Sequence, residues 1–152
     1  MIVEVTNKLI IDYKSREWCK IPYPLHPNGC PNYNHKETCP PKVELMENWC
    51  NLSRGMYFVV VSFNLQVHVN KMLSLYPNWS DRQARCVLYW QPKVKKQLED
   101  ETKLFCAFKN VKYTYCPEAM GVNVIKTLKR LNFPISTHPR EIVYKVSLVV
   151  EI

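Results

Sequence analysis

Three of the seven cysteines in this chain stand directly before proline, at Cys30, Cys39 and Cys116. Proline fixes the backbone φ angle and removes one N–H donor, so each of these steps stiffens the chain beside a sulfur atom. Seven of the eleven prolines accompany these cysteines, at positions 22, 24, 27, 31, 40, 41 and 117. We therefore expect residues 18–41 to form a long irregular loop that holds cysteines in fixed places.

The remaining pattern predicts one domain over residues 1–152, with an α/β body at residues 56–152. Residues 56–65 are apolar on both faces, as in a covered inner strand. Strands and helices then alternate, which predicts an α/β or α+β fold: a single small sheet with helices packed on one face. The expected strands are residues 2–13, 56–65, 103–115 and 142–152, and the expected helices are residues 66–76, a helix after Ser80, and residues 117–131.

Local signals place the helix ends. Ser80 and Gln83 have the spacing of a capping box, so a helix should begin there. Pro92 should kink or divide that helix. Pro117 suits the first turn of the next helix. Cys116 would then lie at a helix N-terminus, where the helix dipole favours a thiolate.

The cysteines are candidate ligands for a soft metal, because thiolate selects zinc, cuprous copper or iron–sulfur clusters. Ten residues separate Cys19 from Cys30, and eight separate Cys30 from Cys39, so neither the C-x2-C pairs of zinc fingers nor the ferredoxin ladder is present. A cysteine followed by proline recurs in ferredoxins, which favours an iron–sulfur cluster. Zinc held by the three cysteines and His26 or His35 is the alternative.

A fourth ligand would come from the body of the chain. Cys116 and Cys86 are the two candidates, and for each the competing interpretation is an ordinary cysteine of the core. Cys86 follows Arg82 and Arg85, whose charges would suit a thiolate, a cluster or a substrate phosphate. Cys106 reads as a core residue, and Cys50 is ambiguous.

The chain shows neither a signal peptide nor an apolar run long enough to cross a membrane. We therefore expect a cytoplasmic protein, in which thiols stay reduced. An odd number of cysteines also argues against a disulfide framework.

The net charge of +8 favours anionic partners such as a nucleotide or nucleic acid. Residues 82–130 hold eleven Lys or Arg and four acids, interleaved with Tyr89, Trp90, Tyr113 and Tyr115. Aromatic rings beside basic side chains suit single-stranded nucleic acid. The interpretation that we favour is plainer: the solvated faces of two helices, with the aromatic rings in the core.

Two segments resemble a family of predicted metal-binding proteins to which no reaction is firmly attached. Residues 30–41, CPNYNHKETCPP, are similar to the Cys-Pro-Pro signature of that family, and residues 117–124, PEAMGVNV, are similar to its Glu-Ala-x-Gly-Ile-Asp-Val helix. The resemblance spans about half of the chain. It implies metal-ligand roles for Cys30, Cys39 and Cys116, with Cys19 in the place of the upstream cysteines of the family.

The sequence thus predicts a small cytoplasmic iron–sulfur protein, with a [4Fe-4S] cluster held by Cys19, Cys30, Cys39 and either Cys86 or Cys116. Such a protein would transfer electrons to a redox partner protein, or would act on a nucleotide or tRNA base if one iron stayed open. The alternative is a zinc-stabilised module that binds nucleic acid or protein without catalysis.

Overall fold

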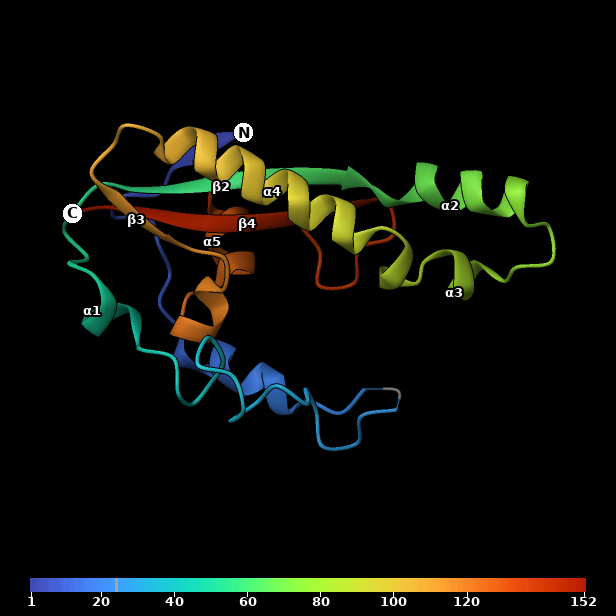
Figure 1. The fold of residues 1–152 in the computed structure, drawn as a ribbon, viewed down its shortest axis with the longest axis horizontal. Helices are drawn as coiled ribbons and strands as arrows, with labels where there is room; N and C mark the ends of the chain where they lie inside the picture. Colours follow the sequence, from blue (N-terminus) through green and yellow to red (C-terminus); the bar gives the residue numbers. More distant parts are fainter. Residues whose placement is uncertain (24) are drawn as a thin grey trace.

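The computed structural model describes residues 1–23 and 25–152, and it confirms an α+β fold built on a single small sheet. The sheet has four antiparallel strands in the order β1-β2-β4-β3 (Figure 1). The strands are β1 Ile2–Glu4, β2 Met56–Asn64, β3 Val111–Thr114 and β4 Ile142–Glu151. The α-helices are α1 Met46–Trp49, α2 Leu65–Leu75, α3 Asp81–Ala84, α4 Gln91–Cys106 and α5 Val124–Arg130, and the 3₁₀ helices are η1 Tyr13–Lys20, η2 Val87–Tyr89 and η3 Pro117–Met120.

The pairing of β2 with β4 forms the centre of the sheet. The paired stretch runs from Met56 opposite Val150 to Asn64 opposite Ile142. Both strands are rich in β-branched residues and have stretches buried on both faces, which is why the sequence of β2 is apolar on both faces. The predicted strands at residues 56–65 and 142–152 are therefore confirmed.

Helices cover both faces of this sheet, so the expectation of helices on one face is wrong. Helix α4 crosses one face, and η3 and α5 lie on the other, while α2 and α3 extend beyond the end of the sheet and join the core under α4 through Leu65, Val69 and Ala84 (Figure 1). The reason is the double-sided burial of the inner strands, because apolar side chains that alternate between two faces need a cover on each.

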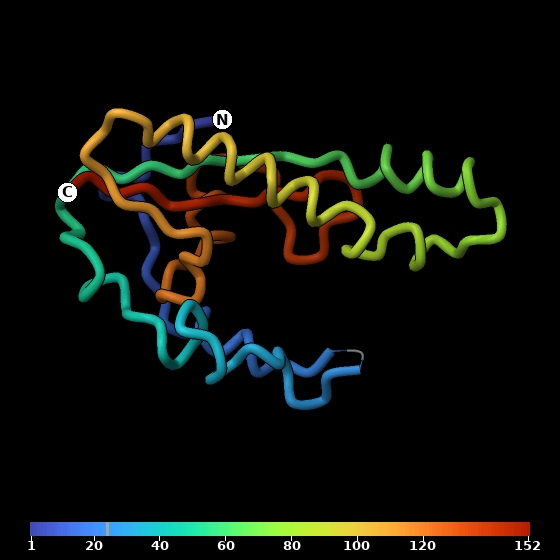
Figure 2. The backbone as a smooth tube through the Cα atoms, in the orientation of Figure 1, coloured from blue at the N-terminus to red at the C-terminus, as the bar shows by residue number. Residues whose placement is uncertain are grey.

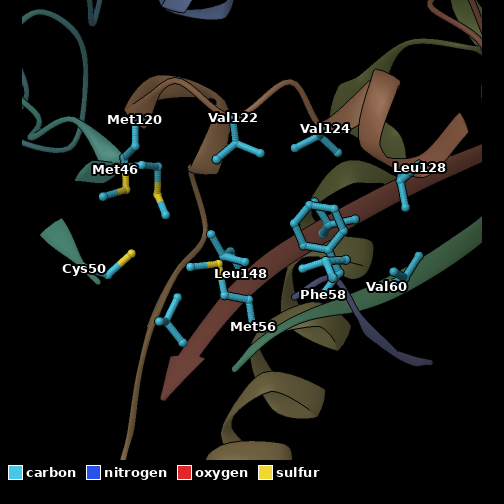
Figure 3. Close-up of a cluster of buried hydrophobic side chains, with 13 residues drawn as sticks. Met46, Cys50, Met56, Phe58, Val60, Met120, Val122, Val124, Leu128 and Leu148 are labelled. Carbon is cyan, nitrogen blue, oxygen red and sulfur yellow. The ribbon is translucent and has the colours of Figure 1, made fainter. Parts of the chain in front are cut away.

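The core on the α5 side contains Phe58 and Leu148 from the two inner strands, with Leu128 of α5 and Met120 of η3 packed over them (Figure 3). On the other side, Val94 and Leu98 of α4 cover Val59 and Val149, among others. A buried hydrogen bond of 2.7 Å between the hydroxyl groups of Thr102 and Ser147 also ties α4 to β4.

The expected strand at residues 103–115 begins too early. Helix α4 continues to Cys106, and only Val111–Thr114 form the strand β3. Leu98 and Thr102 are one helical turn apart and both are buried, so the helix keeps its contact with the sheet beyond residue 98. This packing outweighs the β-propensity of the residues that follow. Pro92 lies in the first turn of α4, and thus divides the predicted helix as expected.

The predicted helix at residues 117–131 is also broken. Gly121 has a φ of +104°, which ends η3, and Asn123 caps the new helix α5 by accepting a hydrogen bond from the Lys126 N–H at 2.9 Å. A side chain at position 121 would also meet the ring of Tyr13 at 2.5 Å. Close approach of η1 therefore decides this break, which the local helical pattern does not reveal.

Replacing Phe58 with alanine should reduce the free energy of unfolding by about 3–5 kcal/mol, because the ring is fully buried between the sheet and α5. Phe108→Ala makes the same chemical change at a fully exposed ring and should alter it by less than about 0.5 kcal/mol. Chemical denaturation of the two variants measures the difference. Equal losses would contradict this placement of the core.

Candidate metal centre

The N-terminal segment docks against the chain that follows β3. The hydroxyl group of Ser15 donates a hydrogen bond of 2.8 Å to the carbonyl of Glu118, and the N–H of Asp12 donates one of 2.7 Å to the carbonyl of Gly121. These bonds join η1, which carries Cys19, to η3, which Cys116 immediately precedes. Two candidate ligands that are distant in sequence are thereby attached to neighbouring elements.

Gly29 turns the loop back so that Cys30 lies beside Cys19. The N–H of Cys30 donates a hydrogen bond of 2.7 Å to the carbonyl oxygen of Cys19. Gly29 has a φ of +83°, and a Cβ atom there would lie 2.3 Å from that same oxygen. Only glycine satisfies both the left-handed conformation and the close approach of the two backbones.

A second turn brings Cys39 toward Cys116. The N–H of Asn34 donates to the carbonyl of Pro40 at 2.7 Å, which closes the segment that contains Cys39. The Cys116 thiol in turn donates to the carbonyl of Thr38 at 3.4 Å. The loop segment, blue to cyan, accordingly runs beneath η3 in Figure 1.

Arg16 fixes the far end of this loop. Its guanidinium group donates hydrogen bonds to the carbonyl oxygens of Pro41 at 3.0 Å and Val43 at 3.1 Å. Arg16 belongs to η1, as does Cys19, so the helix that carries one cysteine also anchors the chain just after Cys39. Sequence reasoning assigned no role to this arginine.

The surroundings raise the pKa of two of these thiols, those of Cys19 and Cys116. Burial raises the pKa of Cys19, and the neighbouring thiols of Cys30 and Cys39 and the carboxyl of Glu118 raise it further. Burial is also the main cause that raises the pKa of Cys116. The expected stabilisation of a Cys116 thiolate by a helix dipole is therefore wrong, since η3 is a single 3₁₀ turn of four residues.

Three of these cysteines border one hollow of about 360 Å³. It lies where β3 has ended, because β3 pairs only with residues 148–151 of β4 and leaves the edge at residues 144–146 open. Cys19, Cys39 and Cys116 line it together with Glu118 and Lys145. Within residues 1–23 and 25–152, no three His, Cys, Asp or Glu side chains are arranged as ligands of one metal ion.

Glu118 and Lys145 are the two ionisable groups of the hollow that sequence reasoning missed. Burial raises the pKa of the Glu118 carboxyl, and burial lowers the pKa of the Lys145 ammonium group. Glu118 had one available signal, its position two residues after Cys116 in the segment that resembles the metal-binding family. Lys145 had none, because it belongs to a strand whose neighbours only the fold defines.

The structure does not bring Cys86 to this group. Cys86 lies between α3 and η2, in the segment that extends beyond the end of the sheet and joins the core under α4, whereas η3 belongs to the core on the other face. Arg85 has a structural role and is not available to a cluster or phosphate, since its guanidinium group donates hydrogen bonds to the Asp81 carboxylate and the carbonyl of Arg140, each at 2.8 Å. Arg82 is exposed.

The other candidate ligands lie apart from the hollow. His26 and His35 border a second depression with Cys30, and the imidazole of His26 packs on the ring of Tyr23 at 4.5 Å. Cys50 is buried in the core on the α5 side, and Cys106 is half-buried against the core under α4.

Comparison with protein-family models, curated proteins and solved structures gives no match for this chain. The resemblance to the Cys-Pro-Pro family therefore stays a prediction. In the described part of the chain, no helix has the length and apolar character that crossing a bilayer requires.

Alkylating reagents react with the thiolate, and burial raises the pKa of the Cys116 thiol. In the metal-free protein, alkylation of Cys116 should therefore reach half of its limiting rate at a higher pH than in the unfolded chain. The same shift stabilises the metal-free fold below the ordinary thiol pKa of about 8.5, and this contribution is lost as the pH rises through the folded value. Mass spectrometry of the Cys116 peptide over a pH series measures the midpoint. A midpoint at or below that of the unfolded chain would contradict the prediction.

Proposed function

We propose that this protein binds a metal centre through Cys19, Cys30, Cys39 and Cys116, and that the centre is an iron–sulfur cluster. The observation that carries the proposal is the hollow at the open edge of β4, on which cysteines from η1, the loop and the start of η3 converge. Cys30 joins them through its backbone bond to Cys19. Cys19, Cys39 and Cys116 line the hollow, and Cys30 would have to turn toward it to complete the four thiolates that common iron–sulfur clusters require.

The proline that follows three of the four cysteines supports a cluster over a single zinc ion, since a ligating cysteine before proline recurs in ferredoxins. The raised pKa of Cys19 fits either metal, because binding would release its proton.

Four cysteine ligands would leave no iron open to a substrate, which favours electron transfer over catalysis. The cluster would supply one-electron redox chemistry when bound. The thiolates would hold it, and the hydrogen bonds of Ser15 and Arg16 would keep the loop against η3. A redox partner protein would then deliver or accept the electron.

Anaerobic purification followed by absorbance spectroscopy and metal analysis tests the proposal. The protein should be brown, absorb at about 400 nm and contain iron with acid-labile sulfide. A colourless protein with one zinc ion per chain would overturn the cluster. A protein that takes up neither metal under reducing conditions would overturn the metal centre itself.

Serine substitution should separate the four proposed ligands from the remaining cysteines. Cys39→Ser and Cys116→Ser should each abolish stoichiometric metal binding, because a hydroxyl is a poor substitute for a soft thiolate. Cys86→Ser is the matched control and should bind the full amount, since Cys86 lies in the segment that extends beyond the end of the sheet. Iron analysis of the three variants decides the distal ligand, and loss in Cys86→Ser with retention in Cys116→Ser would reverse the assignment.

Gly29→Ala should reduce metal uptake at least tenfold, because the added methyl group collides with the backbone of Cys19 and pushes Cys30 away. Gly55→Ala is the control. Its added methyl group meets only the carboxylate end of the Glu151 side chain, which can move aside. Metal titration at equal protein concentration compares the two variants. Equal uptake would show that the turn at Gly29 does not position the site.

A further inference from the structure

A helical arm extends beyond the end of the sheet, away from the proposed metal centre. It comprises residues 65–90, with α2, α3 and η2, and its outer part has no strand beside it (Figures 1 and 2). Its base is anchored on the sheet by Leu65, Val69 and Ala84. Whatever the outer part of the arm displays is therefore held in place by the core.

Three aromatic rings form a column on this arm. The rings of Tyr76 and Trp79 stack with their centroids 4.4 Å apart and their planes at 16°, and the ring of Tyr89 follows at 4.9 Å from that of Trp79, tilted by 32°. We name these three residues the aromatic column. Tyr76 comes from the end of α2 and Tyr89 from η2, so only the fold brings them together.

The column is open to solvent at both ends. Tyr76 and Tyr89 are each 48% exposed. Leu75, beside Tyr76, is 59% exposed, and Leu88, beside Tyr89, is 76% exposed. Isolated exposed apolar residues are ordinary, but a stacked column flanked by exposed leucines marks a contact surface.

The charge on the arm is positive. The only acid among residues 65–90 is Asp81, and it is paired with Arg85 at 2.8 Å and Arg140 at 3.7 Å. Lys71 and Arg82 are exposed on the same arm, and in the part of the chain that the structure describes neither forms an ion pair. Both cations are therefore available to an anionic partner, whereas Glu141 adjoins the base of the arm, where its carbonyl accepts a hydrogen bond of 3.2 Å from the Gln66 N–H.

We propose that this arm binds single-stranded nucleic acid. Unpaired bases would stack on the outer faces of Tyr76 and Tyr89 and so extend a column that already contains stacked rings. Arg82 and Lys71 would face the phosphates. Flat rings combined with basic side chains are the recognised means of binding single strands without a fixed sequence. The proposal does not depend on the metal centre, which lies at the open edge of β4.

The structure also revises which aromatic residues serve this role. Trp90 is buried, with its ring stacked on Phe63 at 5.2 Å, so it is not available to a base. Tyr115 packs toward the core under α4. Tyr76 and Trp79, which precede the basic region of the sequence, take their place.

Fluorescence anisotropy of the full chain with labelled single-stranded DNA and RNA of about 12 nucleotides tests the proposal. Affinity should fall as the salt rises from about 50 mM to about 200 mM, and a blunt duplex of the same length should bind more weakly. Failure to bind either strand at the lower salt would overturn the proposal, as would equal binding of the duplex.

Variants locate the surface. Tyr89→Ala should weaken binding by about 5- to 100-fold, and Tyr89→Phe should retain it, because stacking needs the ring and not the hydroxyl. Tyr113→Ala is the matched control, since Tyr113 is a tyrosine of similar exposure, 40%, on β3 outside the arm. Arg82→Ala should make the dependence of log affinity on log salt shallower by about 0.7.

Three outcomes would count against the arm. A Tyr113→Ala variant that loses as much affinity as Tyr89→Ala would move the surface elsewhere. Equal loss in Tyr89→Phe and Tyr89→Ala would exclude stacking. Association of the chain with itself, abolished by Tyr89→Ala and unaffected by nucleic acid, would show that the column is a contact between protein copies. Circular dichroism and thermal unfolding confirm that each variant is folded.

Discussion

The antiparallel pairing of β2 with β4 is the contact on which the other parts of the molecule depend. It joins residues 56–64 to residues 142–150 and places the last strand of the chain between β2 and β3. Both strands are buried on both faces, so each contributes to the two cores at once. Helices α2, α3, α4 and α5 and the 3₁₀ helix η3 each contribute buried residues to these two cores, and the sheet cannot close before the C-terminal residues are in place.

The proposed metal centre uses an edge that the same topology leaves open. Strand β3 is shorter than β4, so residues 144–146 have no neighbour on that side and border the hollow instead. The chain after β3 turns directly into Cys116 and η3, and η1 docks on η3 through Ser15. The cysteine loop therefore meets the body where the sheet is incomplete. A site formed at such a junction couples the N-terminal segment to the fold, and a bound metal would stabilise that contact further.

The helical arm is separate from this junction. Its inner end belongs to the core under α4, and its outer end carries the aromatic column, with Arg85 holding α3 against Gln66 and the chain near Arg140. The proposed metal centre thus lies at the open edge of β4, and the arm extends beyond the end of the sheet. A protein with an electron-transfer centre at one place and a nucleic-acid surface at the other would have two independent contacts with its partners.

Sequence patterns located the long elements because their signals are local. Strand β2 follows from a run that is apolar on both faces, helix α2 from helical spacing and strand β4 from alternation. Ser80 caps α3 by accepting a hydrogen bond from the Gln83 N–H at 3.1 Å. The boundaries that failed depend on distant contacts. Helix α4 extends to Cys106 because its buried side chains pack against the sheet. The helix after Pro117 breaks at Gly121, where the ring of Tyr13 occupies the space that a side chain would need.

For the proposed site, the sequence by itself determined the residue types. They are cysteines whose neighbouring prolines stiffen the backbone, in a segment without strand or helix periodicity. It left Cys86 and Cys116 as equal candidates, since spacing along the chain carries no information about which face of a sheet a residue reaches. Tertiary structure decided that Cys116 joins the loop and Cys86 does not, and it added Glu118 and Lys145 to the hollow. The physical reason is that a site assembled from separate segments is defined by packing and backbone hydrogen bonds between them, which no local pattern encodes.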